Sequence, residues 1–407
     1  MFWYLIVILI IAPIITLMLE KKPKKKCDIY TQPGPFYYLK FITIYLILRL
    51  RRWRGQQENV AQGVTAGYGQ QSRNTPAQMD CIQPLSSHPK AIDAVYFSAA
   101  NENGCYLVGA IARRPAKMIN GFLYIKLPET GLLLSPRLPD TLMSTHEEAF
   151  GAEGLLFQPV EAMRKWKLTY DGAMRLDKGD QLVHVCMNLD WESKLDYFDF
   201  DTDMHSIALA KAIAREQWSK EFFKKLEDLH QTHHEQFGKI TGTIQIDGFG
   251  CHKVTLDSMR DHSFGDHRDW KYFHRYGFHM GTLNDGTSFN IGIVSQSNLL
   301  TVLELGYLYT PSGEKHPVKW CGLDLACHGE GGTPPLDYGF EFEAGGKRYF
   351  LQCQILASPE FYIGMEWEAR IVERLATYTV NGVKGWGISE WHYRHHGGRP
   401  EKYANRK

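Results

Sequence analysis

The sequence lacks the short motifs that mark several large classes of enzyme. It has no GxGxxG placed between an expected strand and helix, no GxxxxGK followed by Ser or Thr, and no GxSxG. The sequence therefore contains no motif for dinucleotide binding, P-loop nucleotide binding or α/β-hydrolase catalysis. The eight cysteines include no CxxC pair and no zinc-ligand spacing, and no Asn-x-Ser/Thr acceptor occurs. These absences favour reduced, mostly structural thiols in a cytosolic globular body.

An excess of charge of one sign is also missing. The net charge is +1, with 46 basic and 45 acidic residues, so there is no global case for nucleic acid as a partner. The 407 residues are 44% hydrophobic, which is enough for substantial cores in about two or three domains.

The first apolar run, Phe2–Leu19, is long enough to cross most of a ~30 Å hydrocarbon layer as a helix, and we predict a transmembrane anchor. A cleaved signal peptide is the alternative, although no positive residue precedes the run and no small-x-small pattern closes it. Lysines crowd the segment Lys21–Lys26 directly after it. The positive-inside tendency then predicts a single-pass protein with its N-terminus outside and its body in the cytosol, in a membrane that the sequence does not specify.

A second apolar stretch, Phe36–Leu50, carries Lys40 within it and runs into basic residues up to Arg54. Its basic residues fall on one narrow helical face, which suits an interfacial helix better than a second span. The basic clusters would attract anionic membrane lipids. An equally open alternative is that the arginines only keep the segment soluble.

The remaining chain reads as mainly β. Val183, Val185, Met187 and Leu189 alternate with polar residues, as in a strand with one buried face, and Asn-Gly or Asp-Gly pairs mark hairpins. One amphipathic helix between His205 and His230 interrupts the strands. The expected organisation is a membrane anchor at 1–20, a basic juxtamembrane segment with the interfacial helix at 21–54, a flexible tether at 55–90, a first β domain at 91–204, an inter-domain helix at 205–237, a second β domain at 238–395 and a polar tail at 396–407.

The densest cluster of ionisable and aromatic residues is RDHSFGDHRDW, Arg260–Trp270. A carboxylate among apolar and aromatic neighbours has its charged form disfavoured, so Asp261 is a candidate proton donor with His262 in reach. The structural alternative is that Arg260 or Arg268 holds Asp261 or Asp269 in a salt bridge that only fixes a loop.

Three histidines, His230, His233 and His234, precede Glu235 and suggest a metal site. Their HxxHHE order lacks the HExxH register that places two ligands and a base on one helix face. We therefore predict neither a metal nor a cofactor.

The stretch HHEQFGKITGTIQIDG, followed by MRDHSFGDHRDW, resembles the signature of lipocalin-like two-domain β proteins. These belong to the hydroxyneurosporene synthase (carotenoid hydratase) and AttH-like group, and similar modules stand at the front of insect proteins labelled as phosphoenolpyruvate synthases. The resemblance covers roughly Val95 to Trp391. Two departures are Phe264, where the pattern most often has Trp, and Asp266-His267, which puts two residues in place of one.

The resemblance implies two consecutive calycin-like antiparallel barrels or sandwiches with an apolar cavity. It also implies that Asp261 corresponds to an aspartate thought to protonate an isolated double bond in carotenoid hydratases. The chain contains no ATP-binding or phosphohistidine part, so the synthase label is not carried over.

The leading hypothesis is a membrane-anchored protein that binds a hydrophobic, isoprenoid- or lipid-like ligand and acts on it by acid–base chemistry. A non-catalytic lipid-binding or transfer module with a structural ion-pair loop is the alternative, and a membrane scaffold is a third. The expected roles are catalytic for Asp261, His262 and Arg268, cavity-lining for Phe264, Trp270, Tyr272 and Glu235, and loop-structuring for Arg260 and Asp269.

Overall fold

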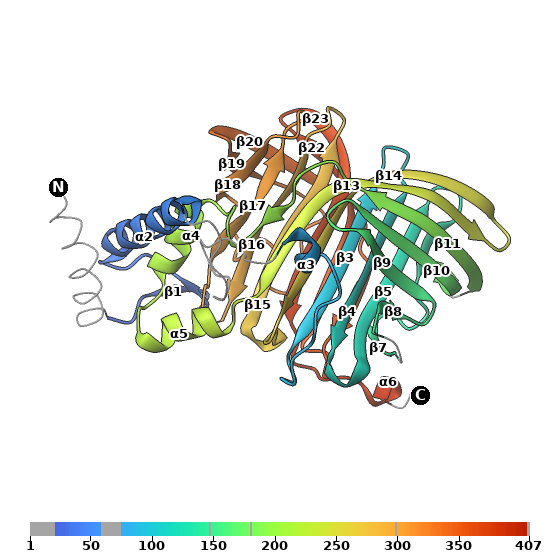
Figure 1. Ribbon diagram of the computed structural model, residues 1–407, viewed down its shortest axis with the longest axis horizontal. Helices are drawn as coiled ribbons and strands as arrows, with labels where there is room; N and C mark the ends of the chain where they lie inside the picture. Colours follow the sequence, from blue (N-terminus) through green and yellow to red (C-terminus); the bar gives the residue numbers. More distant parts are fainter. Residues whose placement is uncertain (1–20, 58–74, 146–147, 180, 298, 405–407) are drawn as a thin grey trace.

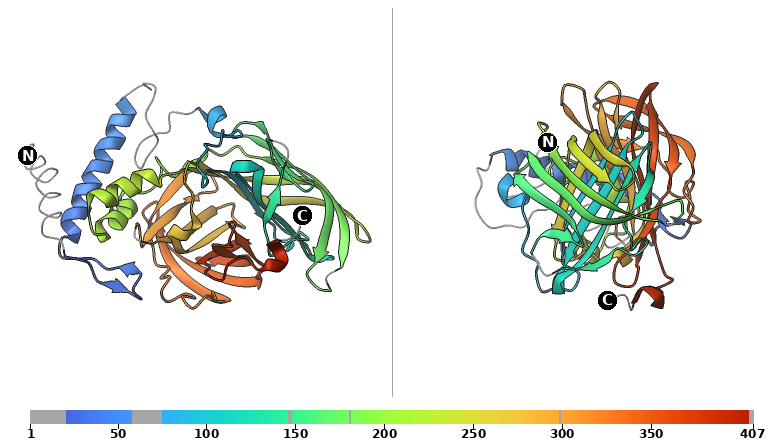
Figure 2. Two further views of the ribbon diagram at one scale, coloured as in Figure 1. Left: turned by 90° about the horizontal axis from the view of Figure 1, so that it is seen from below. Right: turned by 90° about the vertical axis from the view of Figure 1, so that its right-hand side faces the viewer.

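The structure, a computed structural model, describes residues 21–57, 75–145, 148–179, 181–297 and 299–404. These residues form two antiparallel β-barrels that stand side by side (Figures 1 and 2). Three helices, α2 (Tyr37–Gln57), α4 (Ser206–Arg215) and α5 (Lys220–Asp228), lie beyond the second barrel, on the side away from the first. The mainly β, two-barrel architecture predicted from the sequence is confirmed.

The first barrel closes when its last strand in space pairs back with the first. Its strands are β3 (Ile92–Ala100), β4 (Tyr106–Arg114), β5 (Met118–Leu127), β6 (Gly131–Leu134), β10 (Lys165–Leu176), β11 (Leu182–Glu192), β13 (Thr232–Ile246) and β14 (Gly250–Gly265). The spatial order is β11-β13-β14-β3-β4-β5-β6-β10, and β10 pairs again with β11. Short strands β7 (Leu142–Ser144), β8 (Phe150–Ala152), β9 (Leu155–Glu161) and β12 (Phe198–Asp199) extend the sheet.

The second barrel closes in the same way. Its strands are β15 (Phe273–Leu283), β16 (Ser288–Gln296), β17 (Leu303–Tyr309), β18 (Lys315–Cys321), β19 (Asp337–Ala344), β20 (Lys347–Ala357), β22 (Ala369–Val380) and β23 (Val383–Arg394), with β21 (Glu360–Ile363) beside β22. The order β20-β19-β18-β17-β16-β15-β23-β22 closes through β20 and β22. The small elements outside the barrels are β1 (Lys25–Lys26), β2 (Tyr30–Thr31), α3 (Pro76–Met79) and α6 (Glu401–Ala404).

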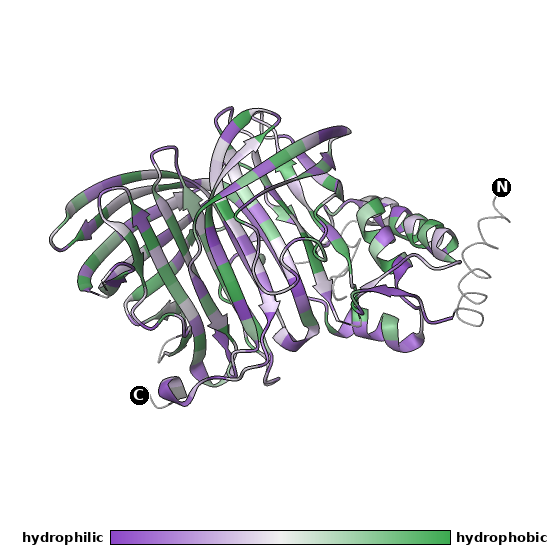
Figure 3. Cartoon of the chain, turned by 180° about the vertical axis from the view of Figure 1, so that it is seen from behind, coloured by the Kyte–Doolittle hydropathy of each residue, from purple (hydrophilic) through white to green (hydrophobic). Residues whose placement is uncertain are grey.

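Side chains fill both barrel interiors. Hydrophobic and polar residues alternate along the strands, as Figure 3 shows, because successive side chains of a strand point to opposite faces. Phe97, Trp166 and Trp191 pack inside the first barrel, while Tyr378 and Trp391 pack inside the second. A third apolar cluster joins the outer faces of the two barrels, where the Phe122 and Phe361 ring centroids are 4.1 Å apart.

The predicted inter-domain helix is two helices rather than one, and it ends sooner than expected. Ser219 begins α5 by accepting a hydrogen bond from the Phe222 N–H, which is a standard helix start. Before it, Glu216 has extended backbone angles and its side chain accepts hydrogen bonds from Thr301 and Thr31. These tertiary contacts interrupt a stripe whose spacing alone looked continuous.

The predicted boundary between the two β domains is also displaced. Strands β13 and β14, which the sequence placed in the second domain, pair with β11 and β3 in the first barrel. Residues 260–265 of the predicted loop are the last part of β14, and residues 260–264 are paired on both sides. Hydrogen bonds between strands that are far apart in the sequence place β13 and β14 in the first barrel. The order of the strands along the chain does not indicate this pairing.

Residues 75–90, assigned to the flexible tether, instead pack on the first barrel. Met79 and Asp80 are buried, and the Asp80 carboxylate pairs with Arg260 inside the barrel. The high content of Gln, Gly and Pro predicted a flexible segment, and no pattern in it indicated that Asp80 would be buried. The other part of the predicted tether, residues 58–74, lies outside the described residues.

Within the described ranges, no helix combines the length and the apolar character that a bilayer span requires. The predicted anchor at 1–20 lies outside those ranges. The stretch predicted to be an interfacial helix is helical, as α2, and it packs along α4. Lys40, expected on its basic face, is instead buried, with its ammonium donating to the Glu216 carbonyl oxygen at 2.6 Å.

Candidate functional site

A cavity of about 280 Å³ lies between the barrels rather than inside either one. Its walls are the outward faces of β3, β4, β13 and β14 from the first barrel and of β15, β16, β22 and β23 from the second. Most of the lining is apolar or aromatic, with Tyr96, Phe122, Phe273, Phe278, Met280 and Ile371 among the residues that form it. A cavity of this composition suits a largely hydrophobic ligand.

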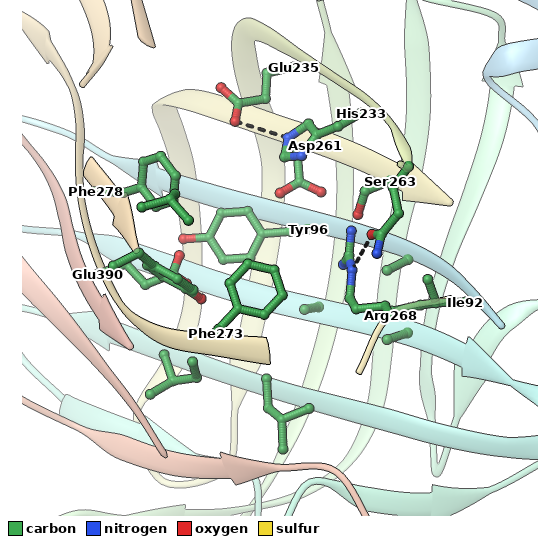
Figure 4. Close-up of a pocket in the computed structure, with 18 of the residues that line it drawn as sticks. Ile92, Tyr96, His233, Glu235, Asp261, Ser263, Arg268, Phe273, Phe278 and Glu390 are labelled. Carbon is green, nitrogen blue, oxygen red and sulfur yellow. Dashed lines mark hydrogen bonds and ion pairs between the residues drawn. The ribbon is translucent and has the colours of Figure 1, made fainter. Parts of the chain in front are cut away.

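The alternation of β14 sends neighbouring residues of the RDHS stretch in opposite directions. Arg260 and His262 point into the first barrel and are fully buried there, whereas Asp261 and Ser263 line the cavity (Figure 4). The same four residues therefore serve two different environments.

On the barrel side, Arg260 forms a bidentate ion pair with Asp80, with nitrogen–oxygen distances of 2.8 and 3.0 Å. His262 lies 2.7 Å from the Asp93 carboxylate through Nε2. Burial alone would raise the pKa of Asp80, but the charge of Arg260 and hydrogen bonds from the histidines hold that pKa well below its usual range. The predicted structural ion pair exists, although its acid is Asp80 and not Asp261 or Asp269.

On the cavity side, Asp261 forms no hydrogen bond or ion pair with any residue that the structure describes. Burial raises the pKa of its carboxyl group to about 6, and the Glu235 charge acts in the same direction. The charges of His233 and Arg268 oppose that rise. Asp261 is thus a carboxyl group poised to exchange a proton near neutral pH.

The cross-strand neighbour of Asp261 is Glu235, which is held by its own partners. Its carboxylate is 3.1 Å from His233 Nε2 and accepts a 2.6 Å hydrogen bond from the Asn290 amide. Burial lowers the pKa of His233, but the hydrogen bond to Glu235 and the charge of Asp261 outweigh it, so the net shift is upward. His233, Glu235 and Asp261 thus face the cavity together (Figure 4).

Arg268 lies on the same wall. Its Nε donates to Gln231 Oε1 at 2.5 Å, and its backbone N–H donates to the Lys90 carbonyl oxygen at 2.8 Å. Burial lowers the pKa of this guanidinium, and the negative charge of Asp261 counters that change. A fixed cation within electrostatic range of Asp261 would favour its ionised form.

The other predicted site residues divide between the cavity and its surroundings. Trp270 lines the cavity and stacks on His392, with ring centroids 5.5 Å apart. Phe264 instead packs beside His262, and Tyr272 contacts the ring of His267, so neither belongs to the cavity lining. Asp269 begins a short 3-10 turn by accepting a hydrogen bond from the Lys271 N–H.

His262 is the clearest departure from the predicted catalytic set. It is buried inside the first barrel, between Asp93 and the Phe150 ring, on the face of β14 opposite to the cavity. The strand geometry explains this, because residues adjacent in a strand cannot share a face.

Two glutamates on the second barrel were missed by sequence reasoning. Glu373 and Glu390 are directly opposite each other on β22 and β23, and both line the cavity. The Tyr96 hydroxyl donates to Glu373 at 2.6 Å, and the Tyr276 hydroxyl donates to Glu390 at 2.5 Å. The sequence signal is that Glu373 alternates with Ile371 and Leu375, which puts the three side chains on one face of a strand. Recognising it requires a strand that is predicted to begin before Leu375.

Among the residues that the structure describes, two side-chain groups have atoms close enough together to hold a metal ion. One is Asp80, His234 and His262 inside the first barrel, and the other is His233, Glu235 and Asp261 on the cavity wall, each with ligand atoms within 4.8 Å of one another. Arg260 already neutralises the first group, and Arg268 faces the second. His230, from the predicted triad of histidines, pairs with Asp201 at 2.6 Å instead.

Solved structures with a similar chain trace include an AttH-type protein of Nitrosomonas europaea, at 10% identity and a TM-score of 0.46 over 77% of this chain and 98% of that one. Kievitone hydratase of Nectria haematococca gives 11% identity and a TM-score of 0.46 over 76% and 90%. A third is CghA, at 10% identity and a TM-score of 0.44 over 80% and 97%.

The comparison with curated protein sequences gives no match. The expected link to insect phosphoenolpyruvate synthases has no support from any of these comparisons. A family model described as a family of unknown function (DUF8627) matches residues 4–393, nearly the whole sequence, and the chain belongs to that family.

Proposed function

We propose that this protein binds a hydrophobic, isoprenoid- or lipid-like molecule between its barrels and transforms it by acid–base chemistry. The observation that carries the proposal is the Asp261 carboxyl group, which faces a mostly apolar cavity without a hydrogen-bond partner among the described residues. A structural carboxylate at that depth would be expected to have its oxygens paired.

The reaction would begin when protonated Asp261 donates its proton to an isolated carbon–carbon double bond. The resulting carbocation would add water, lose a different proton or be attacked by a second double bond, giving hydration, isomerisation or cyclisation. Trp270, Phe273 and Tyr276 line the same space, and their aromatic rings would stabilise the cation. Arg268 would stabilise the Asp261 carboxylate that the transfer leaves, and the proton released when water adds or the cation loses a proton would restore the acid.

The decisive experiment compares Asp261→Asn with Asp266→Asn, a change at an exposed acid in the same segment. Candidate isoprenoids would be incubated with each variant, with ligand binding and product formation measured separately. We expect Asp261→Asn to bind normally and lose turnover by about a hundredfold or more, the usual contribution of a proton donor. Equal turnover by both variants would refute the catalytic role.

The alternative function is a non-catalytic lipid carrier. It is favoured by the ion pair between Arg260 and Asp80, which gives the charged part of the RDHS stretch a structural role without any chemistry. A protein that binds lipids from a membrane extract and never alters them, in wild-type or variant form, would establish this alternative.

Attachment to a membrane forms the second part of the proposal, with residues 2–19 as an anchor and the body on the cytosolic side. Tyr38, Ile42, Leu50 and Trp53 are exposed on α2 at spacings of three, four or eight residues, which places them on one helical face. Arg49 is exposed on the same face. An apolar stripe that carries a cation fits the surface of a bilayer that contains anionic lipids.

A further inference from the structure

The pair Glu373 and Glu390 stands out among the buried charges of the second barrel. The two residues oppose each other on β22 and β23, where directly opposite like charges destabilise a sheet. No ion pair joins either carboxylate to a lysine, arginine or histidine among the described residues. Their recorded partners are the hydroxyl groups of Tyr96 and Tyr276, which donate hydrogen bonds but carry no positive charge.

The facing wall of the cavity differs because cationic side chains accompany its acids. There, Asp261 and Glu235 are accompanied by Arg268 and by His233, which binds Glu235 at 3.1 Å. Glu373 is 1% exposed, so water does not screen the charge of its carboxylate. The β22–β23 wall therefore carries two acids in an apolar space. A positive charge to balance them would have to come from a ligand in the cavity.

A second observation points to a ligand that donates hydrogen bonds. Asn290 lines the cavity and is 1% exposed, and its Oδ1 has no hydrogen-bond partner in the part of the chain that the structure describes. Its amide nitrogen is already committed to Glu235. A buried carbonyl oxygen without a donor is costly, so a ligand group that donates a hydrogen bond to Asn290 Oδ1 would remove that cost.

We propose that the ligand carries a protonated amine, which the Glu373–Glu390 pair binds at the polar end of the cavity while the apolar chain lies along the aromatic wall. This inference rests on the proposed function, because it names the class of ligand for the same cavity. The ammonium group would donate to the two glutamate oxygens that the tyrosines leave free and supply the missing charge.

Without an amine, the pair would be neutralised by protons. Burial and the neighbouring Glu390 raise the pKa of Glu373 well above its usual value, and burial raises the pKa of Glu390 to about 7. The titratable groups that face the pair are Tyr96, Tyr124, Tyr276, Asp261, Glu235 and His233. An entering ammonium would displace a proton from the pair, so binding should release protons to the buffer.

The test uses the whole wild-type chain and three unreactive probes of equal length: octylamine, octanol and octanoate. Titration calorimetry would measure each affinity, and repeating it in buffers of different ionisation enthalpy would count the protons released. We expect octylamine to bind about tenfold or more tightly than octanol, with octanoate weakest, since a charge-assisted hydrogen bond replaces a neutral one.

The variants Glu373→Gln and Glu390→Gln remove one charge each, keep the side-chain size and retain an acceptor for the tyrosine. We expect each to reduce the preference for octylamine over octanol to less than about threefold. Glu341→Gln, a change at an exposed acid on the same barrel, should keep the preference.

Two negative results have different meanings. Equal binding of octylamine and octanol by the wild-type chain would overturn the amine inference and leave the cavity proposal intact. Failure of all three probes to bind would instead contradict the cavity proposal itself.

Discussion

At the scale of single residues, the chemistry of this protein depends on which face of β14 a side chain occupies. Arg260 and Asp261 are consecutive, yet Arg260 forms a bidentate ion pair and Asp261 has no partner among the described residues. A partly buried carboxyl group without a partner is more stable when protonated, and its pKa accordingly rises to about 6. Stability and pH are therefore linked at this residue.

Asp261→Asn should stabilise the protein at high pH and leave it unchanged at low pH. The pKa of Asp261 is raised in the folded state from 3.8 to about 6, so the folded protein binds the proton more tightly than the unfolded chain. Stability then falls as pH rises from about 4 to 6, and a cost of up to about 3 kcal/mol persists above that range. Thermal unfolding at pH 4 and pH 8 measures the difference. A variant that is less stable than wild type at pH 8 would contradict the assignment.

Substitution at the Arg260–Asp80 pair should destabilise the protein, in contrast to Asp261→Asn. Arg260→Met leaves the Asp80 carboxylate buried without its cation, and we expect a loss of about 3 kcal/mol or more in a urea titration. Adding Asp80→Asn removes the unpaired charge and should restore part of that loss. The exposed pair Lys239–Asp257 serves as the control, since Lys239→Met should cost less than about 1 kcal/mol. Similar losses at both sites would show that burial does not matter here.

At the scale of elements, α2 combines two faces with different partners. Ile44 and Leu48 join the apolar cluster that continues into α4 and the second barrel, while Trp53 and Tyr38 are 56% and 76% exposed on the other side. Aromatic residues beside arginines are typical of segments that lie at a membrane interface. The proposed orientation places that outer face on the lipid.

Trp53 should lie within reach of lipid tails when the full chain is reconstituted in vesicles that contain phosphatidylserine. Brominated lipids quench nearby tryptophan fluorescence, so Trp53→Phe should remove a quenched part of the signal. Trp386→Phe, a change at the junction of the barrels, should remove an unquenched part. If Trp53→Phe leaves the quenching ratio unchanged, then α2 does not contact the bilayer.

At the scale of the whole molecule, the barrels are joined by contacts that also enclose the cavity. The Tyr96 hydroxyl of the first barrel donates to Glu373 of the second, and the Tyr106 hydroxyl donates to the Ala376 carbonyl oxygen at 2.9 Å. Both interiors are filled with side chains, so a ligand between them touches both folding units at once. Binding should therefore stabilise the two barrels jointly.

Differential scanning calorimetry tests this coupling. A ligand at about 100 times its Kd stabilises the state that binds it by about 2.7 kcal/mol. Because both barrels form the cavity walls, we expect the unfolding transitions of both to shift upward and to merge. Movement of only one transition would place the ligand inside a single barrel.

The sequence by itself determined the local chemistry: the strand alternation, the hairpin turns and the acid–aromatic character of Arg260–Trp270. It also indicated the two-barrel class through the residues around Glu235 and Asp261. It did not determine that β13 and β14 close the first barrel, that Asp80 is the partner of Arg260, or that Glu373 and Glu390 join Asp261 at one cavity. Those pairings join residues up to about 180 positions apart, and only closure of the sheets brings them together.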